Sequence, residues 1–78
     1  MTVKTIKKYI KQYHLDGNSK FDRDVLRSFV TTYCYEKDIN VDTGAWTLLI
    51  NDLYDAVKEQ GLKMSLNKFD MEMCHFLV

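Results

Sequence analysis

The segment between residues 42 and 61 constrains the fold of this chain more than any other. Its apolar side chains recur at i, i+3, i+4, i+7 and i+11; they are Trp46, Leu49, Ile50, Leu53 and Val57. This spacing places them on one face of an α-helix and does not fit the two-residue alternation of a strand. Asp42 or Thr43 is suited to cap the start of this helix, and Gly61 is suited to end it. The segment therefore predicts an amphipathic helix.

Three further helices follow from weaker patterns of the same kind. The first helix, at about 2–14, has apolar residues at Val3, Ile6, Ile10 and Tyr13. The second is capped by Asp22 and runs to Glu36, with apolar residues at Val25, Leu26, Phe29, Val30 and Tyr33. The last begins at Ser65 or Asn67 and has apolar residues at Phe69, Met73, Phe76 and Leu77. Ile39 and Val41 have the spacing of a very short strand in the polar connection between the second and third helices.

The composition agrees with four helices that share one core. The chain has no proline and only three glycines among 78 residues, and 46% of its residues are hydrophobic. A chain of this length makes a single domain, 1–78. We therefore predict an all-α fold, a small four-helix domain with room for very short strands.

The cellular location of the chain is predicted from the absence of membrane-spanning and signal-peptide segments. No apolar run approaches the roughly 20 residues that cross a bilayer, and the lysine-bearing start has no signal-peptide core. A cytoplasmic location without membrane contact is therefore expected. In that compartment Cys34 and Cys74, which are far apart in the sequence, should be reduced, half-buried thiols.

The stretch HLDGNSKFDRDV, residues 14–25, has the look of an EF-hand calcium loop. When its apolar residue is aligned with that of the loop, His14, Ser19 and Val25 stand where the loop needs an acid, a glycine and a bidentate glutamate. We therefore expect a turn that binds no metal. In that turn Phe21 should anchor the chain in the core and Asp22 should cap the helix that follows.

No other constellation in the sequence predicts catalysis. There is no Gly-rich phosphate loop, Ser/His/Asp pattern or HExxH motif. Cys74 and His75 are adjacent, so a helix would point them in different directions. The acids Asp52, Asp55 and Glu59 are typical of a solvated helix face. The expectation is a protein that is not an enzyme and has no catalytic residue, metal site or cofactor.

The charges are divided unevenly along the chain. Residues 1–20 carry five lysines and one acid, a balance of +4, whereas residues 21–78 carry six basic and ten acidic side chains, a balance of −4. Four of those lysines fall on one face of the first helix: Lys4, Lys7, Lys8 and Lys11. They predict contacts with nucleic-acid phosphates, with Tyr9 or Tyr13 at the margin for stacking. The alternative is a face that only confers solubility.

The C-terminal two-thirds of the chain carries a family resemblance. The matching residues are Phe29 and Cys34 in one helix, Leu53, Tyr54, Asp55, Ala56 and Gly61 in the next, and Ser65, Phe69 and Met73 in the last. With this pattern, residues 29–77 resemble the winged-helix modules associated with primase-helicases of phages, plasmids and mobile genetic elements. The resemblance implies a helix-turn-helix body at about 22–78, in which the turn Gly61–Leu66 sets the last helix across the third. Because the sequence ends at Val78, a full wing is not expected.

In that family the last helix would be the recognition helix. Its exposed side should carry Lys68, Met71, Glu72 and His75. Arg, Asn and Gln, the usual readers of base edges, are nearly absent there, and acids repel phosphate. An exposed methionine within a mixed-charge rim suits a protein partner, so these four residues are predicted to bind protein.

These observations lead to one functional expectation and two alternatives. The resemblance implies an accessory protein of mobile-element or phage DNA replication. It would bind a larger replication protein (primase, polymerase or helicase) through its last helix and bind nucleic acid weakly and without sequence preference through its first. The first alternative is a small phage-type inhibitor that binds a protein and no nucleic acid. The second is a small DNA-binding regulator of the excisionase or repressor type.

Overall fold

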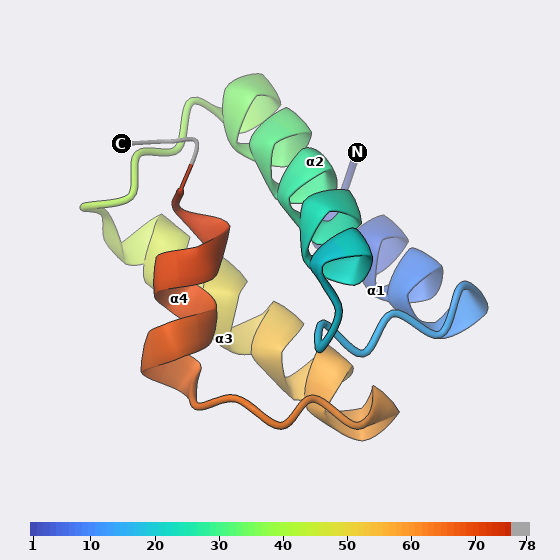
Figure 1. Ribbon diagram of the computed structural model, residues 1–78. Helices are drawn as coiled ribbons and strands as arrows, with labels where there is room; N and C mark the ends of the chain where they lie inside the picture. The colour runs from blue at the N-terminus through green and yellow to red at the C-terminus, as the bar shows by residue number, and fades with distance from the viewer. Residues whose placement is uncertain (76–78) are drawn as a thin grey trace.

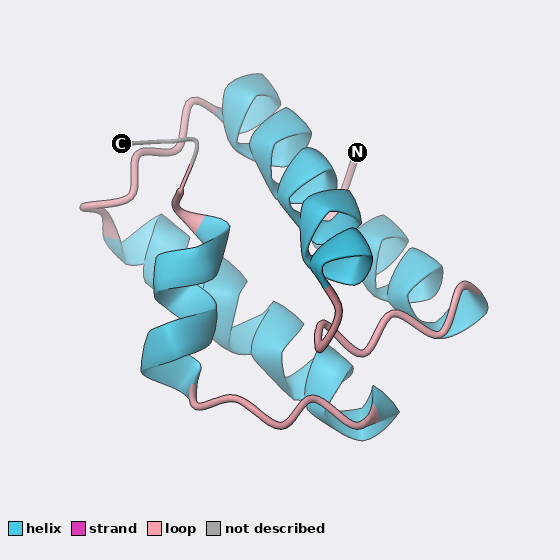
Figure 2. Cartoon of the chain, in the orientation of Figure 1, coloured by secondary structure: helices cyan, strands magenta, loops and turns pink. Residues whose placement is uncertain are grey.

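Four α-helices form the described part of the chain. The computed structural model describes residues 1–75 and contains, in chain order, α1 (Val3–Gln12), α2 (Lys20–Lys37), α3 (Gly44–Gln60) and α4 (Leu66–Met73) (Figure 1). Within residues 1–75 there is no strand (Figure 2). The predicted all-α, four-helix fold is confirmed, and the short strand at Ile39 and Val41 does not form. Two predicted core residues, Phe76 and Leu77, lie outside the described part of the chain.

A hydroxyl oxygen caps the start of every helix. Each cap accepts a hydrogen bond from the backbone N–H three residues later; the caps are Thr2, Ser19, Thr43 and Ser65. Capping of this kind satisfies a backbone donor that has no partner inside the helix. The prediction that Asp22 caps α2 is therefore wrong, because Ser19 does so.

Asp22 has a different task at the start of α2. Its Oδ2 accepts hydrogen bonds from the backbone N–H groups of Asp16, at 2.9 Å, and Gly17, at 3.4 Å. A carboxylate in the first turn also lies at the positive end of the helix dipole. Asp22 thus ties the turn before α2 to the helix itself.

The core gathers one stripe from each helix and one residue from each of two loops. Its buried members are Ile6, Ile10, Leu15, Leu26, Val30, Cys34, Trp46, Leu49, Ile50, Leu53, Val57, Leu62, Phe69 and Met73. α1 packs on α3, and α4 packs on both α2 and α3. None of the described helices combines the length and the hydrophobicity that a bilayer crossing requires.

Two aromatic residues that were predicted to point inward lie on the surface. Phe21 is 73% exposed and Tyr13 is 57% exposed, so the predicted anchoring role of Phe21 is wrong. Phe21 is the second residue of α2 and points away from the stripe that begins at Leu26. Leu15 and Gly17 are the buried residues of this turn instead.

The turn before α2 is also joined to the turn after α3. The Asn18 side chain donates from Nδ2 to the Gly61 carbonyl at 2.9 Å, and its Oδ1 accepts from the Lys63 N–H at 2.9 Å. Gly61 ends α3 with φ at +113°, as predicted for a residue at this position. One amide therefore connects two loops that are far apart in the sequence.

Candidate functional site

The lysine face of α1 is the first candidate site. Lys4, Lys8 and Lys11 are exposed, and within residues 1–75 they form no ion pair. With Thr2, Thr5 and Lys7 they line a shallow depression of about 520 Å³. The structure thus brings together all four lysines that the sequence predicted to bind phosphate.

Lys7 differs from the other three lysines. Its Nζ lies 3.2 Å from Asp52 Oδ1 on α3. A second depression, of about 200 Å³, lies where α1 meets α3, and Lys7, Lys11, Asp55 and Glu59 are among its lining residues. A row of acids therefore runs beside the lysines and weakens the positive potential on that side. The side of α1 turned away from α3 is the more favourable one for an anion.

Tyr9 of α1 and Tyr13, the residue that follows the end of α1, do not join the lysine face. The Tyr9 ring stacks on Phe29 of α2, with ring centroids 5.1 Å apart, and Tyr13 lies next to Tyr9 at 5.9 Å. At about 100° per residue, Tyr13 lies roughly 200° around the helix axis from Lys11. The structure therefore separates both predicted stacking residues, Tyr9 and Tyr13, from the predicted phosphate contacts.

The outer side of α4 is the second candidate site. Lys68, Met71 and His75 are exposed there, and the Met71 side chain is 71% exposed. Glu72 is only partly exposed, because its carboxylate binds the guanidinium of Arg27 on α2. Of the four predicted partner-binding residues, three therefore lie on the open surface and the fourth holds α4 against α2.

Arg27 was not singled out by the sequence patterns and is the one buried charged residue described. It is 9% exposed. Its Nε donates to the Glu72 carbonyl oxygen at 2.7 Å and its NH1 to Asp24 Oδ1 at 2.7 Å. Arg23 Nε lies 3.7 Å from Glu72 Oε2. Its position in the sequence could have predicted this burial. Arg27 follows Leu26 and precedes Val30 by three residues, so it borders the apolar stripe of its helix.

The packing of α4 on α3 rests on two aromatic residues of α3. The indole Nε1 of Trp46 donates to Asp70 Oδ1 at 3.0 Å, and the Tyr54 hydroxyl donates to the Met64 carbonyl at 3.0 Å. The Tyr54 ring also lies 5.7 Å from the Phe69 ring. These contacts join α3 to α4 and to the turn between them.

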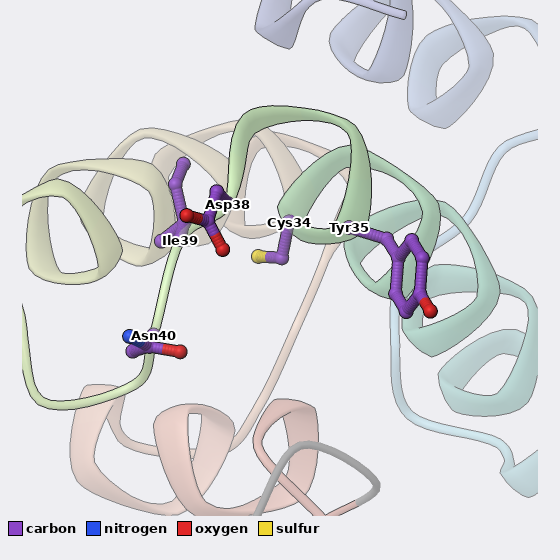
Figure 3. Close-up of a pocket in the computed structure, with 5 residues that line it drawn as sticks. All are labelled: Cys34, Tyr35, Asp38, Ile39 and Asn40. Atoms are coloured by element: carbon purple, nitrogen blue, oxygen red, sulfur yellow. The ribbon is translucent and has the colours of Figure 1, made fainter.

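The cavity beside Cys34 contains no strongly reactive nucleophile among its lining residues. It has a volume of about 450 Å³ and is lined by Cys34, Tyr35, Asp38, Ile39 and Asn40 (Figure 3). Burial raises the pKa of the Cys34 thiol, so the thiol stays protonated at neutral pH and is a poor nucleophile. Figure 3 shows the Tyr35 ring pointing away from the Cys34 sulfur.

The stretch that resembled a calcium loop is a hydrogen-bonded turn. Asp16 Oδ1 accepts from the Asn18 N–H at 2.9 Å, and this bond is the main reason why the pKa of Asp16 is lowered. Across residues 1–75, no three or more His, Cys, Asp or Glu side chains are grouped so that they could hold a metal ion. The carboxylates of Asp16 and Asp22 in this turn accept hydrogen bonds from backbone N–H groups.

No family model, curated protein or solved structure matches this chain.

Proposed function

We propose that this chain is a non-enzymatic accessory domain of mobile-element or phage DNA replication. In this role it binds nucleic acid weakly through the lysine face of α1 and a larger replication protein through the outer side of α4, in the cytoplasm. One observation carries the nucleic-acid half of the proposal. Lys4, Lys8 and Lys11 are exposed on one face and form no ion pair within residues 1–75.

The strength of the nucleic-acid contact follows from the number of unpaired lysines. Each phosphate that a lysine neutralises releases condensed counterions, with a salt slope of about −0.9 per contact for duplexes and about −0.7 for single strands. Three lysines therefore predict a slope between about −2 and −3. The absence of a stacking tyrosine on this face argues for contacts to the backbone alone, without sequence preference.

The protein-binding half of the proposal rests on the outer side of α4. Met71 is a large flexible apolar side chain in the open, with Lys68 and His75 on the same side. The bond between Glu72 and Arg27 fixes α4 against α2, so the surface is held in place before a partner arrives. The identity of the partner as a primase, polymerase or helicase comes from the family resemblance alone.

A second candidate function is that of an inhibitor that binds a protein and no nucleic acid. The ion pair between Lys7 and Asp52, with Asp55 and Glu59 alongside, favours it. In this case Lys7 docks α1 on α3, and the acids beside it repel phosphate.

Binding of labelled single- and double-stranded DNA at about 20 mM and about 200 mM salt tests the proposal. A variant with Lys4, Lys8 and Lys11 changed to Glu should lose binding. A control with Lys37, Lys58 and Lys63, three exposed lysines elsewhere, changed to Glu has the same net charge and should retain much more of it. Equal losses in the two variants, or no binding by the wild-type chain at low salt, would remove the nucleic-acid half. A sequence-selective footprint would favour the DNA-binding regulator instead.

A further inference from the structure

The outward face of α2 is uncharged over most of its length. Between Asp24 and Glu36 the only charged residue is Arg27, and it points inward to bind Glu72. Long exposed faces of soluble helices normally carry charged side chains. This face therefore lacks the charged side chains that normally favour exposure of a helix surface to solvent.

Two aromatic residues frame the uncharged face. Phe21 and Tyr35 are 73% and 89% exposed, and each lies seven positions from Ser28 in the sequence. A separation of seven residues returns to almost the same side of a helix, so all three lie on one line along α2. Beside Ser28 is a hollow of about 280 Å³, lined by Asp24, Arg27, Ser28, Thr31 and Thr32. The middle of the face is therefore small and recessed, and its ends are large and aromatic.

We propose that two copies of this chain associate through this face as an antiparallel pair of α2 helices, with a two-fold axis beside Ser28. In this arrangement Phe21 of each copy meets Tyr35 of the other, and the small Ser28 side chains let the helices approach closely. At about 100° per residue, Asp24 and Thr31 lie on the same flank of the face. The two-fold axis then brings the Asp24 carboxylate of one copy to the Thr31 hydroxyl of the other, and the half-buried Val25 to the Thr32 methyl.

The arrangement of aromatic and charged side chains argues for a second copy in this orientation. The line Phe21, Ser28, Tyr35 reads large, small, large in either direction, which is what a two-fold interface requires. Asp24, whose Oδ1 pairs with Arg27 of the same helix, is the only charged residue among residues 21–35 that is exposed. An antiparallel pairing separates it from its copy by about 12 Å along the helix axis, more than a Debye length at physiological salt. A parallel pairing would set the two carboxylates side by side.

The size of the face limits the area that the dimer can bury. α2 has 18 residues and is about 27 Å long, so one face of it makes an interface at the small end of the range for specific complexes. We therefore expect a transient dimer with a dissociation constant on the order of 100 µM. This inference does not depend on nucleic-acid binding, and it leaves α4 uncovered.

Sedimentation of the full chain from about 10 µM to about 1 mM measures the fraction of dimer. Two variants that place opposite charges at Ser28 test the geometry of the interface. Because residue 28 faces its own copy, Ser28→Asp and Ser28→Lys should each be monomeric over this range. An equimolar mixture of the two variants should recover association at least as tight as that of the wild type. Circular dichroism should show all of them to be as helical as the wild type.

A matched pair of variants controls for non-specific association through exposed apolar side chains. Tyr35→Glu should weaken the dimer at least tenfold. Leu48→Glu, which places the same charge at a 73% exposed apolar residue of α3, should leave it unchanged. A wild-type chain that stays monomeric at about 1 mM overturns the proposal and leaves the face to a helix of another protein. A dimer that the Ser28 mixture fails to restore, or that Leu48→Glu breaks and Tyr35→Glu does not, also overturns it.

Discussion

The carboxylate of Glu72 on α4 binds the guanidinium of Arg27 on α2, and Arg27 Nε donates to the carbonyl oxygen of the same residue at 2.7 Å. These two contacts join residues 45 positions apart in the chain. Arg27 is buried on the flank of the core, and its NH1 also pairs with Asp24 Oδ1 at 2.7 Å.

Loss of the Glu72 carboxylate should therefore destabilise the fold. Glu72→Gln leaves Arg27 partly uncompensated, and we expect a loss of about 1–3 kcal/mol in the free energy of unfolding. Urea unfolding followed by circular dichroism measures it. The control Glu59→Gln, on the exposed side of α3, should change stability by less than about 0.5 kcal/mol. Similar values for the two variants would show that the ion pair adds nothing.

The amide of Asn18 is predicted to hold two loops together. Asn18→Ala removes both its bond to the Gly61 carbonyl and its bond to the Lys63 N–H, and should cost about 1–2 kcal/mol. Hydrogen exchange adds a local test, because the Lys63 amide should exchange faster in the variant than in the wild type. Asn67→Ala, at an exposed position of α4, serves as the comparison. An unchanged Lys63 exchange rate would contradict the role assigned to Asn18.

Two glycines should respond to alanine with opposite signs. Gly17 has φ at +76°, and a Cβ there would lie 3.0 Å from Leu62 Cδ1, so Gly17→Ala should lower stability by more than about 1 kcal/mol. Gly44 begins α3, and a Cβ there would meet nothing within 4 Å. Gly44→Ala should therefore raise stability by about 0.4–1 kcal/mol. Thermal unfolding of the two variants measures both changes, and a common sign would refute the assignment.

Acid should weaken the turn at Asp16. The hydrogen bond from the Asn18 N–H is the largest cause that lowers the pKa of Asp16 below 3.8, so the folded state binds that proton less readily than the unfolded chain does. The resulting stability is present above pH 3.8 and is lost as the pH falls through the lowered pKa. Asp16→Asn keeps an acceptor for the Asn18 N–H and does not titrate. Unfolding free energies below pH 5 should therefore fall less steeply in this variant, and parallel curves would exclude Asp16 as a cause.

The helices and most of the core were predictable because they depend on neighbours in the sequence. Helical spacing identified the stripe from Trp46 to Val57, and Thr43 and Ser65 were among the predicted caps. The start of α2 was misplaced because both Ser19 and Asp22 are good caps, and only the three-dimensional turn decides between them. Phe21 was misassigned because hydrophobicity alone does not show which way a residue in the first turn of a helix points.

The candidate site was less predictable, since its properties depend on contacts between helices. The spacing of Lys4, Lys7, Lys8 and Lys11 predicted their common face, but not the ion pair between Lys7 and Asp52, 45 positions away. In the same way, the helical pattern placed Glu72 on the outer side of α4. The buried Arg27 on another helix draws its carboxylate inward.

The packing of α1 on α3 has a consequence for synthesis of the chain. Ile6 and Ile10 leave the ribosome before α3 does, and the helix on which α1 packs is complete only when Gln60 has followed. Until then α1 is a short amphipathic helix with its apolar side in water, and a helix of 10 residues is only marginally stable alone. The nascent chain should therefore remain open to chaperones and proteases until α3 has emerged, and the core should be completed only when α4 follows and packs on α2 and α3.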